Sequence, residues 1–304
     1  MFCGYRAKAE KPDWGKFCRP LWGANAVVFI PLYDSNVLRH IRIQYVTLVL
    51  IIANCVVWLG FGTSFFLSDT AVQATVFSFG FIPVVATGIE TLPPQLAIIP
   101  AWATYFSYAF LHGDFMHLAG NMLFIWVFGD NVEDAMGHLR YLAFFLLCAA
   151  AGAFAHAFVL PTSQAPLIGA SGAAAGIIAA YLMLHPNVKV WVLALGRIPI
   201  RLSAFWLIGA WILFQIGNLA WSSADPVSWA AHVGGIAAGA ILLPLLKRSN
   251  VPFFDTKPVD EVVPPLPPPA VAEPGYPLPG QPRVELPESP AEPSPWGRQG
   301  GKPQ

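Results

Sequence analysis

Long apolar runs separated by short polar segments dominate the middle of the chain. An α-helix needs about 20 mostly apolar residues to cross the hydrocarbon core of a membrane, and a helix satisfies its own backbone there. Six runs approach or reach this length, and we predict a helical membrane span from each of them: residues 45–62, 115–129, 141–160, 169–184, 202–220 and 228–246. The expected fold is therefore an all-α membrane protein with six transmembrane helices.

The stretch between the first two predicted spans, residues 63–114, is too long to be a simple turn. It contains two further apolar segments, 70–89 and 91–110, and Gly and Pro residues interrupt both. One added span would reverse the orientation of every later loop, whereas two added spans would preserve it. We favour a long outer loop that lies partly in the membrane interface, with two added spans as the alternative.

Lysine and arginine occur on only one side of the predicted spans. They lie before the first span, after the second, fourth and sixth spans, and in the C-terminal segment; the loops after the first, third and fifth spans contain none. Because short cytoplasmic loops are enriched in Lys and Arg, both termini are predicted to be cytoplasmic. The expected location is a bacterial inner (plasma) membrane, in which the protein would be multi-pass.

The composition agrees with a membrane protein and excludes other classes. Of the 304 residues, 56% are hydrophobic and 11% are charged, and 17 Lys and Arg balance 17 Asp and Glu. Without excess positive charge, a nucleic acid is not an expected partner. We divide the chain into a basic cytoplasmic N-terminal segment (1–43), a membrane domain (44–248) and a Pro-rich cytoplasmic tail (249–304). The tail is expected to be a disordered spacer, with a role as a proline-rich ligand as the alternative.

Four polar side chains within the predicted spans are candidate functional residues, because polar groups are costly in lipid. His117 and Asn121 are four residues apart on one face of the second span. Ser171 opens the fourth span and His232 lies near the start of the sixth. These three spans enter the membrane from the same side, so the four side chains are expected at similar depth. Taken singly, each is more often a packing or hydrogen-bonding residue.

Together these four side chains are suited to acyl transfer. A histidine that removes the proton of a serine hydroxyl makes the serine a nucleophile, and Asn121 and His117 can donate hydrogen bonds to a developing oxyanion. No carboxylate is placed at this depth, so the sequence favours a Ser–His dyad over a Ser–His–Asp triad. The chain also lacks the sequence motifs of a zinc metalloprotease and of a phosphate-binding loop.

Small residues predict which of these helices touch. Gly172 and Gly176 are four residues apart on the fourth span, and Gly235 and Gly239 share a face with His232 on the sixth. Glycines at this spacing allow helix backbones to approach closely. Such packing would bring the fourth and sixth spans, and with them the serine and the histidine, into contact.

Three sequence blocks carry a resemblance to a known family. They are His112-Gly-Asp-Phe-Met-His117-Leu-Ala-Gly-Asn121, Gly169-Ala-Ser171-Gly172 and Ala231-His232-Val-Gly-Gly235-Ile-Ala-Ala-Gly239. In order and spacing they resemble the rhomboid family of intramembrane serine proteases. The resemblance implies a six-helix bundle with a long, partly interfacial first outer loop. It also implies an endopeptidase that works in the lipid bilayer and cleaves transmembrane segments of other membrane proteins near the outer face.

The resemblance also implies roles for individual residues. Ser171 would be the nucleophile, His232 the general base, and Asn121 with His117 the lining of the oxyanion hole. No cofactor and no metal ion is implied. Supporting positions would be His112, Gly169, Gly172, Gly235 and Gly239.

The sequence departs from the family pattern at two positions. Many active members have an aromatic residue four positions after the nucleophile, where it stacks on the catalytic histidine, and this chain has Ala175 there. Many also have a Trp-Arg pair upstream of the first block, whereas Trp102 is followed here by Ala103. The alternative function is a catalytically weak or inactive rhomboid-like protein that binds membrane helices.

Overall fold

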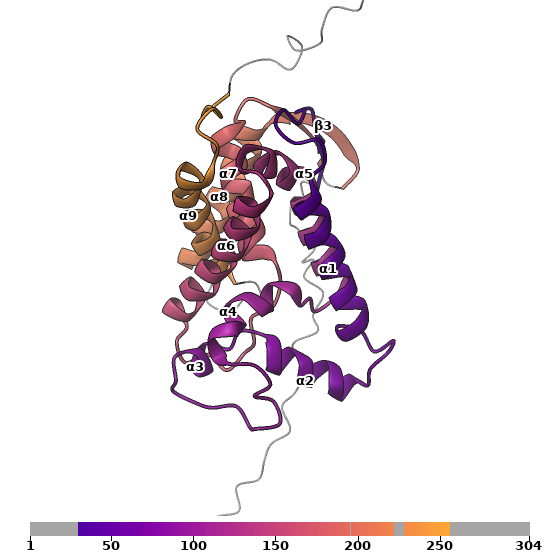
Figure 1. Ribbon diagram of the computed structural model, residues 1–304, viewed down its shortest axis with the longest axis vertical. Helices are drawn as coiled ribbons and strands as arrows, with labels where there is room; N and C mark the ends of the chain where they lie inside the picture. The colour runs from indigo at the N-terminus through magenta and orange to yellow at the C-terminus, as the bar shows by residue number, and fades with distance from the viewer. Residues whose placement is uncertain (1–29, 195, 222–227, 256–304) are drawn as a thin grey trace, which may run out of the picture. The chain divides into compact units, whose positions relative to one another are not determined.

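A computed structural model describes residues 30–194, 196–221 and 228–255, and this part of the chain is mostly helical. Each predicted span coincides with a helix, and helices α6, α8 and α9 are long and apolar enough to cross a membrane. Most of the predicted N-terminal segment and nearly all of the predicted tail lie outside the described residues. The helices at the six predicted spans are α1 (Tyr45–Phe61), α5 (Phe115–Met136), α6 (His138–Val159), α7 (Ser171–Leu184), α8 (Ala204–Trp221) and α9 (Trp229–Leu246) (Figure 1).

The long segment between α1 and α5 contains only short helices. The longest, α2, has 11 residues and is therefore about 16 Å long, roughly half of what a span requires. This length argues against two added spans, while the interfacial position of the segment stays a prediction. The elements here are α2 (Asp69–Phe79), α3 (Pro83–Ala86), η2 (Ala101–Ala103), α4 (Thr104–Ser107) and η3 (Tyr108–Phe110).

The expectation of an all-α fold is wrong in one respect, because three strands form an antiparallel sheet. The strands are β1 (Ile30–Asp34), β2 (Lys189–Ala194) and β3 (Ile198–Ser203), in the order β1-β2-β3. Ile30 pairs with Leu193, and Lys189 pairs with Ser203. The sheet therefore joins the segment before α1 to the β2–β3 hairpin between α7 and α8.

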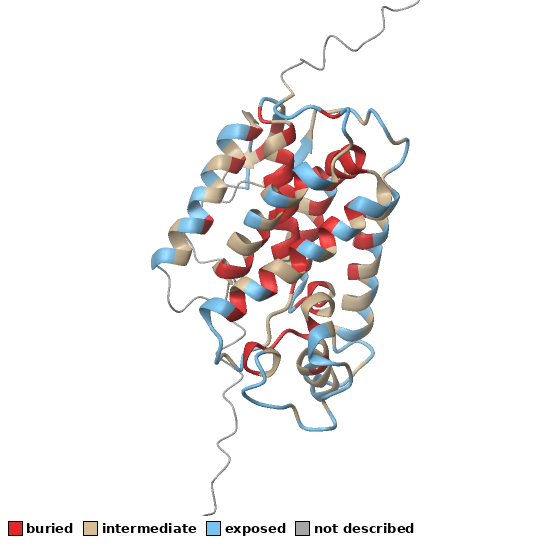
Figure 2. Ribbon diagram, turned by 60° about the vertical axis from the view of Figure 1, so that its left-hand side comes forward, coloured by how far each residue is buried: buried red, intermediate tan, exposed pale blue. Residues whose placement is uncertain are grey.

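Helix α7 lies at the centre of the helices and contacts α5, α6, α8 and α9. Nearly all of its residues are buried, and Figure 2 shows the buried residues concentrated on the central helices. Glycine and alanine make up much of α7 and let the neighbouring backbones approach it. At its far end, the larger Tyr181 packs edge-on against Phe128 of α5, with ring centroids 4.8 Å apart.

Helix α5 continues to Met136, seven residues beyond the predicted end of the second span, because the acidic residues there are paired inside the fold. The carboxylate of Glu133 is fully buried. It accepts hydrogen bonds from the backbone N–H groups of Val46 (3.0 Å) and Thr47 (2.8 Å) and from Thr47 Oγ1 (2.7 Å). Glu133 thus caps the first turn of α1, whose own N-cap residue makes no side-chain bond.

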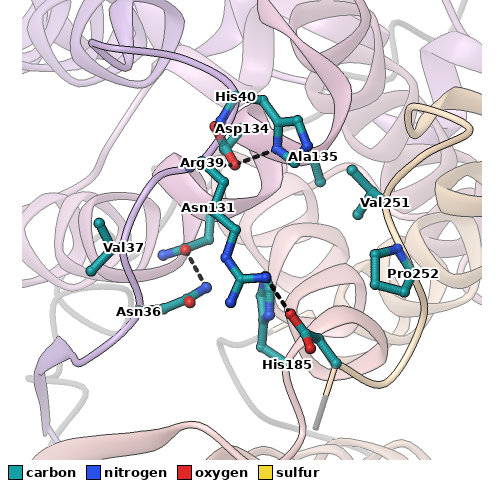
Figure 3. Close-up of a pocket in the computed structure, with 11 residues that line it drawn as sticks. Asn36, Val37, Arg39, His40, Asn131, Asp134, Ala135, His185, Val251 and Pro252 are labelled. Carbon is teal, nitrogen blue, oxygen red and sulfur yellow. Dashed lines mark hydrogen bonds and ion pairs between the residues drawn. The ribbon is translucent and has the colours of Figure 1, made fainter. Parts of the chain in front are cut away.

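Asp134 holds the chain that leads into α1. Its carboxylate accepts the backbone N–H groups of Arg39 (3.1 Å), His40 (2.6 Å) and Ile41 (2.7 Å), and it pairs with His40 Nδ1 at 3.0 Å. Nearby, Arg39 Nη1 pairs with Asp255 Oδ2 at 2.7 Å across a cavity of about 30 Å³ (Figure 3). The segment that precedes α1 and the segment that follows α9 in the sequence therefore meet near the C-terminal end of α5.

Asp34 ties the sheet to two helices. Its Oδ2 accepts hydrogen bonds from the hydroxyl of Tyr181 on α7 (2.5 Å) and from Asn131 Nδ2 on α5 (3.0 Å). Burial raises the pKa of Asp34 to about 6, although the hydrogen bond from Tyr181 opposes that change. The carboxylate is therefore still ionised at neutral pH, when it accepts both bonds.

The first residues of the predicted tail also bind to the helices. The backbone N–H of Phe254 donates to the carbonyl of Met183, and that of Asp255 to the carbonyl of Leu184. These bonds satisfy the C-terminal end of α7, where helix carbonyls lack partners within the helix. The predicted segment boundaries at residues 43 and 249 stay predictions. Residues before the first boundary and after the second nevertheless contact the helices.

Replacing Glu133 tests whether this cap stabilises the fold. We expect Glu133→Ala to lower the free energy of unfolding by about 3 kcal/mol, because three donors would lose a buried ionic acceptor. Thermal unfolding of the detergent-solubilised protein measures the change. Glu90→Ala is the matched control, since Glu90 is exposed and, among the described residues, its carboxylate accepts a hydrogen bond from the Gln164 side chain alone. Equal melting temperatures for the two variants would contradict the proposed cap.

Candidate active site

The backbones of α7 and α9 touch at two pairs of glycines. A Cβ atom on Gly235 would overlap the carbonyl oxygen of Gly172, and one on Gly239 would overlap that of Gly176. Helix α6 joins the contact, since a Cβ on Gly152 would lie 2.9 Å from the Ala231 carbonyl oxygen. The glycine stripes predicted from the sequence therefore do meet, and a side chain at Gly235 or Gly239 would overlap the backbone of α7.

This contact brings the regions of Ser171 and His232 together. Ser171 is the first residue of α7, and His232 lies in the first turn of α9. A Cβ on Gly172, next to Ser171, would be 3.3 Å from the carbonyl of Ala231, next to His232. Both side chains are half-buried, and within the described residues no hydrogen bond joins them. The proton transfer expected between them stays a prediction.

His232 has a hydrogen-bond partner that the sequence did not indicate. Its Nδ1 lies 2.8 Å from Oε1 of Gln215, which α8 contributes and which is 3% exposed. The amide oxygen is an acceptor only, so this bond assigns the ring proton to Nδ1 and leaves the lone pair on Nε2. Gln215 thus selects the tautomer in which Nε2 can accept a proton.

Two tryptophans contact the His232 ring. Trp211 of α8 is stacked on it at an interplanar angle of 28°, and Trp229 meets it edge-on, with centroid distances of 6.4 and 6.0 Å. Ala175, where many family members have an aromatic residue, is instead fully buried in α7. That one position therefore does not indicate the ring contacts of His232, which come from α8 and from the first residue of α9 itself.

His112 orients the amide of Asn121. The Nε2 atom of His112 lies 3.0 Å from Asn121 Nδ2 and 3.5 Å from the backbone N of Ala170. Two donors directed at one ring nitrogen indicate that His112 is neutral and carries its proton on Nδ1. This arrangement leaves the second hydrogen of the Asn121 amide available. The supporting role of His112 stays a prediction, and this contact is consistent with it.

His117 and Asn121 lie beside the start of α7. Gly169, just before this helix, has φ +114°, and a Cβ there would overlap the His117 ring and lie 3.5 Å from Asn121 Nδ2. The first N–H groups of a helix have no partners within the helix, so those at Ser171 and beyond add donors at the same place. The four candidate residues, which three helices (α5, α7 and α9) contribute, therefore lie at one end of α7.

The start of α9 is fixed by a further pair. The hydroxyl of Ser228 accepts the backbone N–H of Ala231 (3.1 Å) and lies 2.7 Å from Nδ1 of His156 on α6. This cap sets the direction of the first turn of α9, which carries His232. Among the residues that the structure describes, no group of three or more His, Cys, Asp or Glu side chains is arranged to hold a metal ion.

About half of the chain matches a known domain family. The family model of the Rhomboid domain matches residues 100–249, which include all three sequence blocks. This region is a Rhomboid domain. The predicted resemblance to the rhomboid family is thereby confirmed, and Ser171, His232, His117 and Asn121 all lie within the matched region.

Similar proteins come from several kinds of organism. "Rhomboid protein 1, mitochondrial" of Saccharomyces cerevisiae is 29% identical over 143 residues, 44% of this chain and 38% of that protein. "RHOMBOID-like protein 12, mitochondrial" of Arabidopsis thaliana is 28% identical over 167 residues, 49% of this chain and 48% of that protein. "Rhomboid protease GlpG" of Klebsiella pneumoniae is 29% identical over 143 residues, 46% of each chain.

These matches span less than half the length of each of the three relatives. Relatives named as mitochondrial match alongside one from a bacterium. The relatives therefore do not single out the bacterial inner membrane, which stays a prediction together with the cytoplasmic termini.

The glycine contact within the rhomboid domain can be tested directly. We expect Gly235→Ala to destabilise the protein by roughly 1–3 kcal/mol or more, because the new methyl group has no space against Gly172. Gly209→Ala on α8 is the control: nothing lies within 4 Å of a Cβ there, so stability should be unchanged or slightly higher. Thermal unfolding in detergent measures both. Equal effects at the two sites would show that α7 and α9 are not in contact.

Proposed function

We propose that this protein is an intramembrane serine endopeptidase that cleaves transmembrane segments of other membrane proteins. The observation that carries the proposal is the gathering of Ser171, His232, His117 and Asn121 at one end of α7 by close backbone packing. The similarity to a protein named a rhomboid protease is consistent with it. We further propose that the six helices at the predicted spans all cross the membrane.

The reaction would begin at Ser171. As the hydroxyl oxygen bonds to the carbonyl carbon of the substrate peptide, Nε2 of His232 accepts the hydroxyl proton. The histidine then gives this proton to the departing amine, which breaks the peptide bond and leaves an ester on Ser171. Water attacks the ester with His232 again as the base, and the hydroxyl of Ser171 is restored.

The negative charge that develops on the substrate oxygen would be met by neutral donors. Asn121 can offer its second amide hydrogen because His112 occupies the first, and His117 and the backbone N–H of Ser171 lie beside it. Preorganised donors of this kind stabilise the transition state more than the ground state. A neutral oxyanion hole also suits a site inside a membrane, where an unpaired charge is expensive.

Gln215 would be the positioning residue for the base. In soluble serine proteases a carboxylate accepts the Nδ1 proton of the histidine, but a carboxylate is costly at this depth. The amide oxygen of Gln215 accepts the same proton without introducing a charge. The dyad thus gains a neutral third partner from α8, which the sequence pattern did not suggest.

The dyad is tested with a fluorophosphonate and a generic transmembrane substrate. We expect the probe to attach covalently to Ser171, with labelling lost in Ser171→Ala and strongly reduced in His232→Ala because the base is missing. Cleavage of the substrate should fall in parallel, and the melting temperature of each variant provides the folding control.

Undiminished labelling of Ser171→Ala would place the nucleophile elsewhere. A folded wild-type protein that retains the transmembrane substrate on an affinity resin, but neither cleaves it nor reacts with the probe, would instead identify the alternative. That alternative is a rhomboid-like protein that binds membrane helices without cutting them.

The role of Gln215 is tested by two variants of similar size. Gln215→Met removes the acceptor and should lower kcat by about ten- to a hundred-fold with little change in KM, because the base loses its tautomer control. Gln215→Glu keeps an acceptor oxygen in either protonation state and should restore most of the activity. Full turnover in Gln215→Met, or equal loss in both variants, would show that Gln215 acts only in packing.

A further inference from the structure

A cleft at the junction of α5, α6 and α9 is not used by the proposed reaction. Its volume is about 530 Å³, and we refer to it as the basic cleft. It is lined by Met136, Gly137, His138, Leu139, Arg140, Arg248, Ser249 and Asn250. We propose that the basic cleft binds the phosphate headgroup of an anionic phospholipid.

The side chains of the basic cleft are suited to an anion. Two of the lining residues are arginines and none is acidic; the ring of His138, which also lines the cleft, is bonded to the buried Glu133. The buried Nε of Arg248 has no hydrogen-bond partner among the described residues, and Arg140 makes only a long bond, 3.5 Å, to the Leu246 carbonyl. Guanidinium groups with unused donors match the geometry of phosphate oxygens. The carboxylate of Glu133, which bonds to His138 at the cleft, is fully buried and also accepts hydrogen bonds from the start of α1.

The backbone around the basic cleft adds to its attraction for anions. Helix α6 begins at His138 after Gly137, which provides no side-chain cap. The positive end of this 22-residue helix therefore faces the cleft without a competing side-chain acceptor. Arg248 is held against it, because its backbone N–H donates to the Ala135 carbonyl at 2.9 Å and its Nη2 would lie 3.0 Å from a Cβ on Gly137.

The position of the cleft favours a lipid over a soluble anion. It lies at the first turn of α6 and just beyond the last turn of α9, and both helices are long and apolar enough to cross a membrane. Leu139 at the cleft is 82% exposed, and Leu245 on the last turn of α9 is 72% exposed. A headgroup in the cleft would have apolar surface next to it for its acyl chains. Basic pockets between helices at headgroup depth bind anionic lipids in this way.

Native mass spectrometry of the purified full-length chain tests the proposal. We expect the wild type to retain phosphatidylglycerol in preference to phosphatidylcholine. The double variant Arg140→Gln/Arg248→Gln should bind phosphatidylglycerol about 30-fold more weakly, since each basic residue near the surface contributes about 1 kcal/mol. The matched control is Arg42→Gln/Arg201→Gln, which removes the same charge outside the cleft and should reduce binding far less.

Three outcomes would overturn the proposal. These are equal retention of the two lipids by the wild type, equal loss in the cleft and control variants, and displacement of the bound lipid by millimolar inorganic phosphate, which would identify a site for a soluble anion. A variant that keeps both charges, Arg140→Lys/Arg248→Lys, should retain much of the binding.

Discussion

The contact between the backbones of α7 and α9 is the constraint on which the site depends. Helices in lipid gain little from burying apolar side chains against each other, so they associate through close packing and hydrogen bonds. Here the carbonyls of Gly172 and Gly176 lie where side chains on Gly235 and Gly239 would otherwise be. Ser171 and His232 stand near the same end of this contact. A small separation of the two helices would therefore also separate the two residues of the proposed dyad.

Three paired carboxylates of the protein lie away from the candidate site. The carboxylates of Asp34, Glu133 and Asp134 are all paired near the last turns of α5, where they fix the sheet and the entry to α1. At the start of α7, by contrast, the hydrogen-bonding partners are the amides Asn121 and Gln215. Because an ionised group in hydrocarbon is costly, a reactive site there is better built from dipoles than from charges.

The sequence predicted the helices well, because a long apolar run has only one stable backbone conformation in lipid. It also predicted the α7–α9 contact, since glycines at four-residue spacing are a local pattern. It did not predict the sheet, because β1 finds its partner more than 150 residues away and the apolar residues of β2 resemble the edge of a span. The extension of α5 was missed because Glu133 and Asp134 suggested a loop until their partners were known.

Of the candidate site, too, the sequence predicted some residues and missed others. Ser171, His232, His117 and Asn121 were identified as polar side chains at a common depth, and the structure brings the regions that carry them together. Gln215 was missed because only its place opposite His232, on a different helix, distinguishes it from any other polar residue in an apolar helix. The ring contacts of His232 with Trp211 and Trp229 were missed for a similar reason, since no single motif contains the three residues.

The cap that Glu133 places on α1 also bears on how the chain assembles during synthesis. Helix α1 emerges from the ribosome long before α5, so its first N–H groups must remain hydrated at the membrane surface until the carboxylate arrives. Glu133 in turn can leave water only when Val46 and Thr47 are there to receive it. Each helix thus removes the other's cost of dehydration. The pair can dock as soon as α5 is inserted, which makes it a platform on which α6, α7 and α9 are added in the order of their translation.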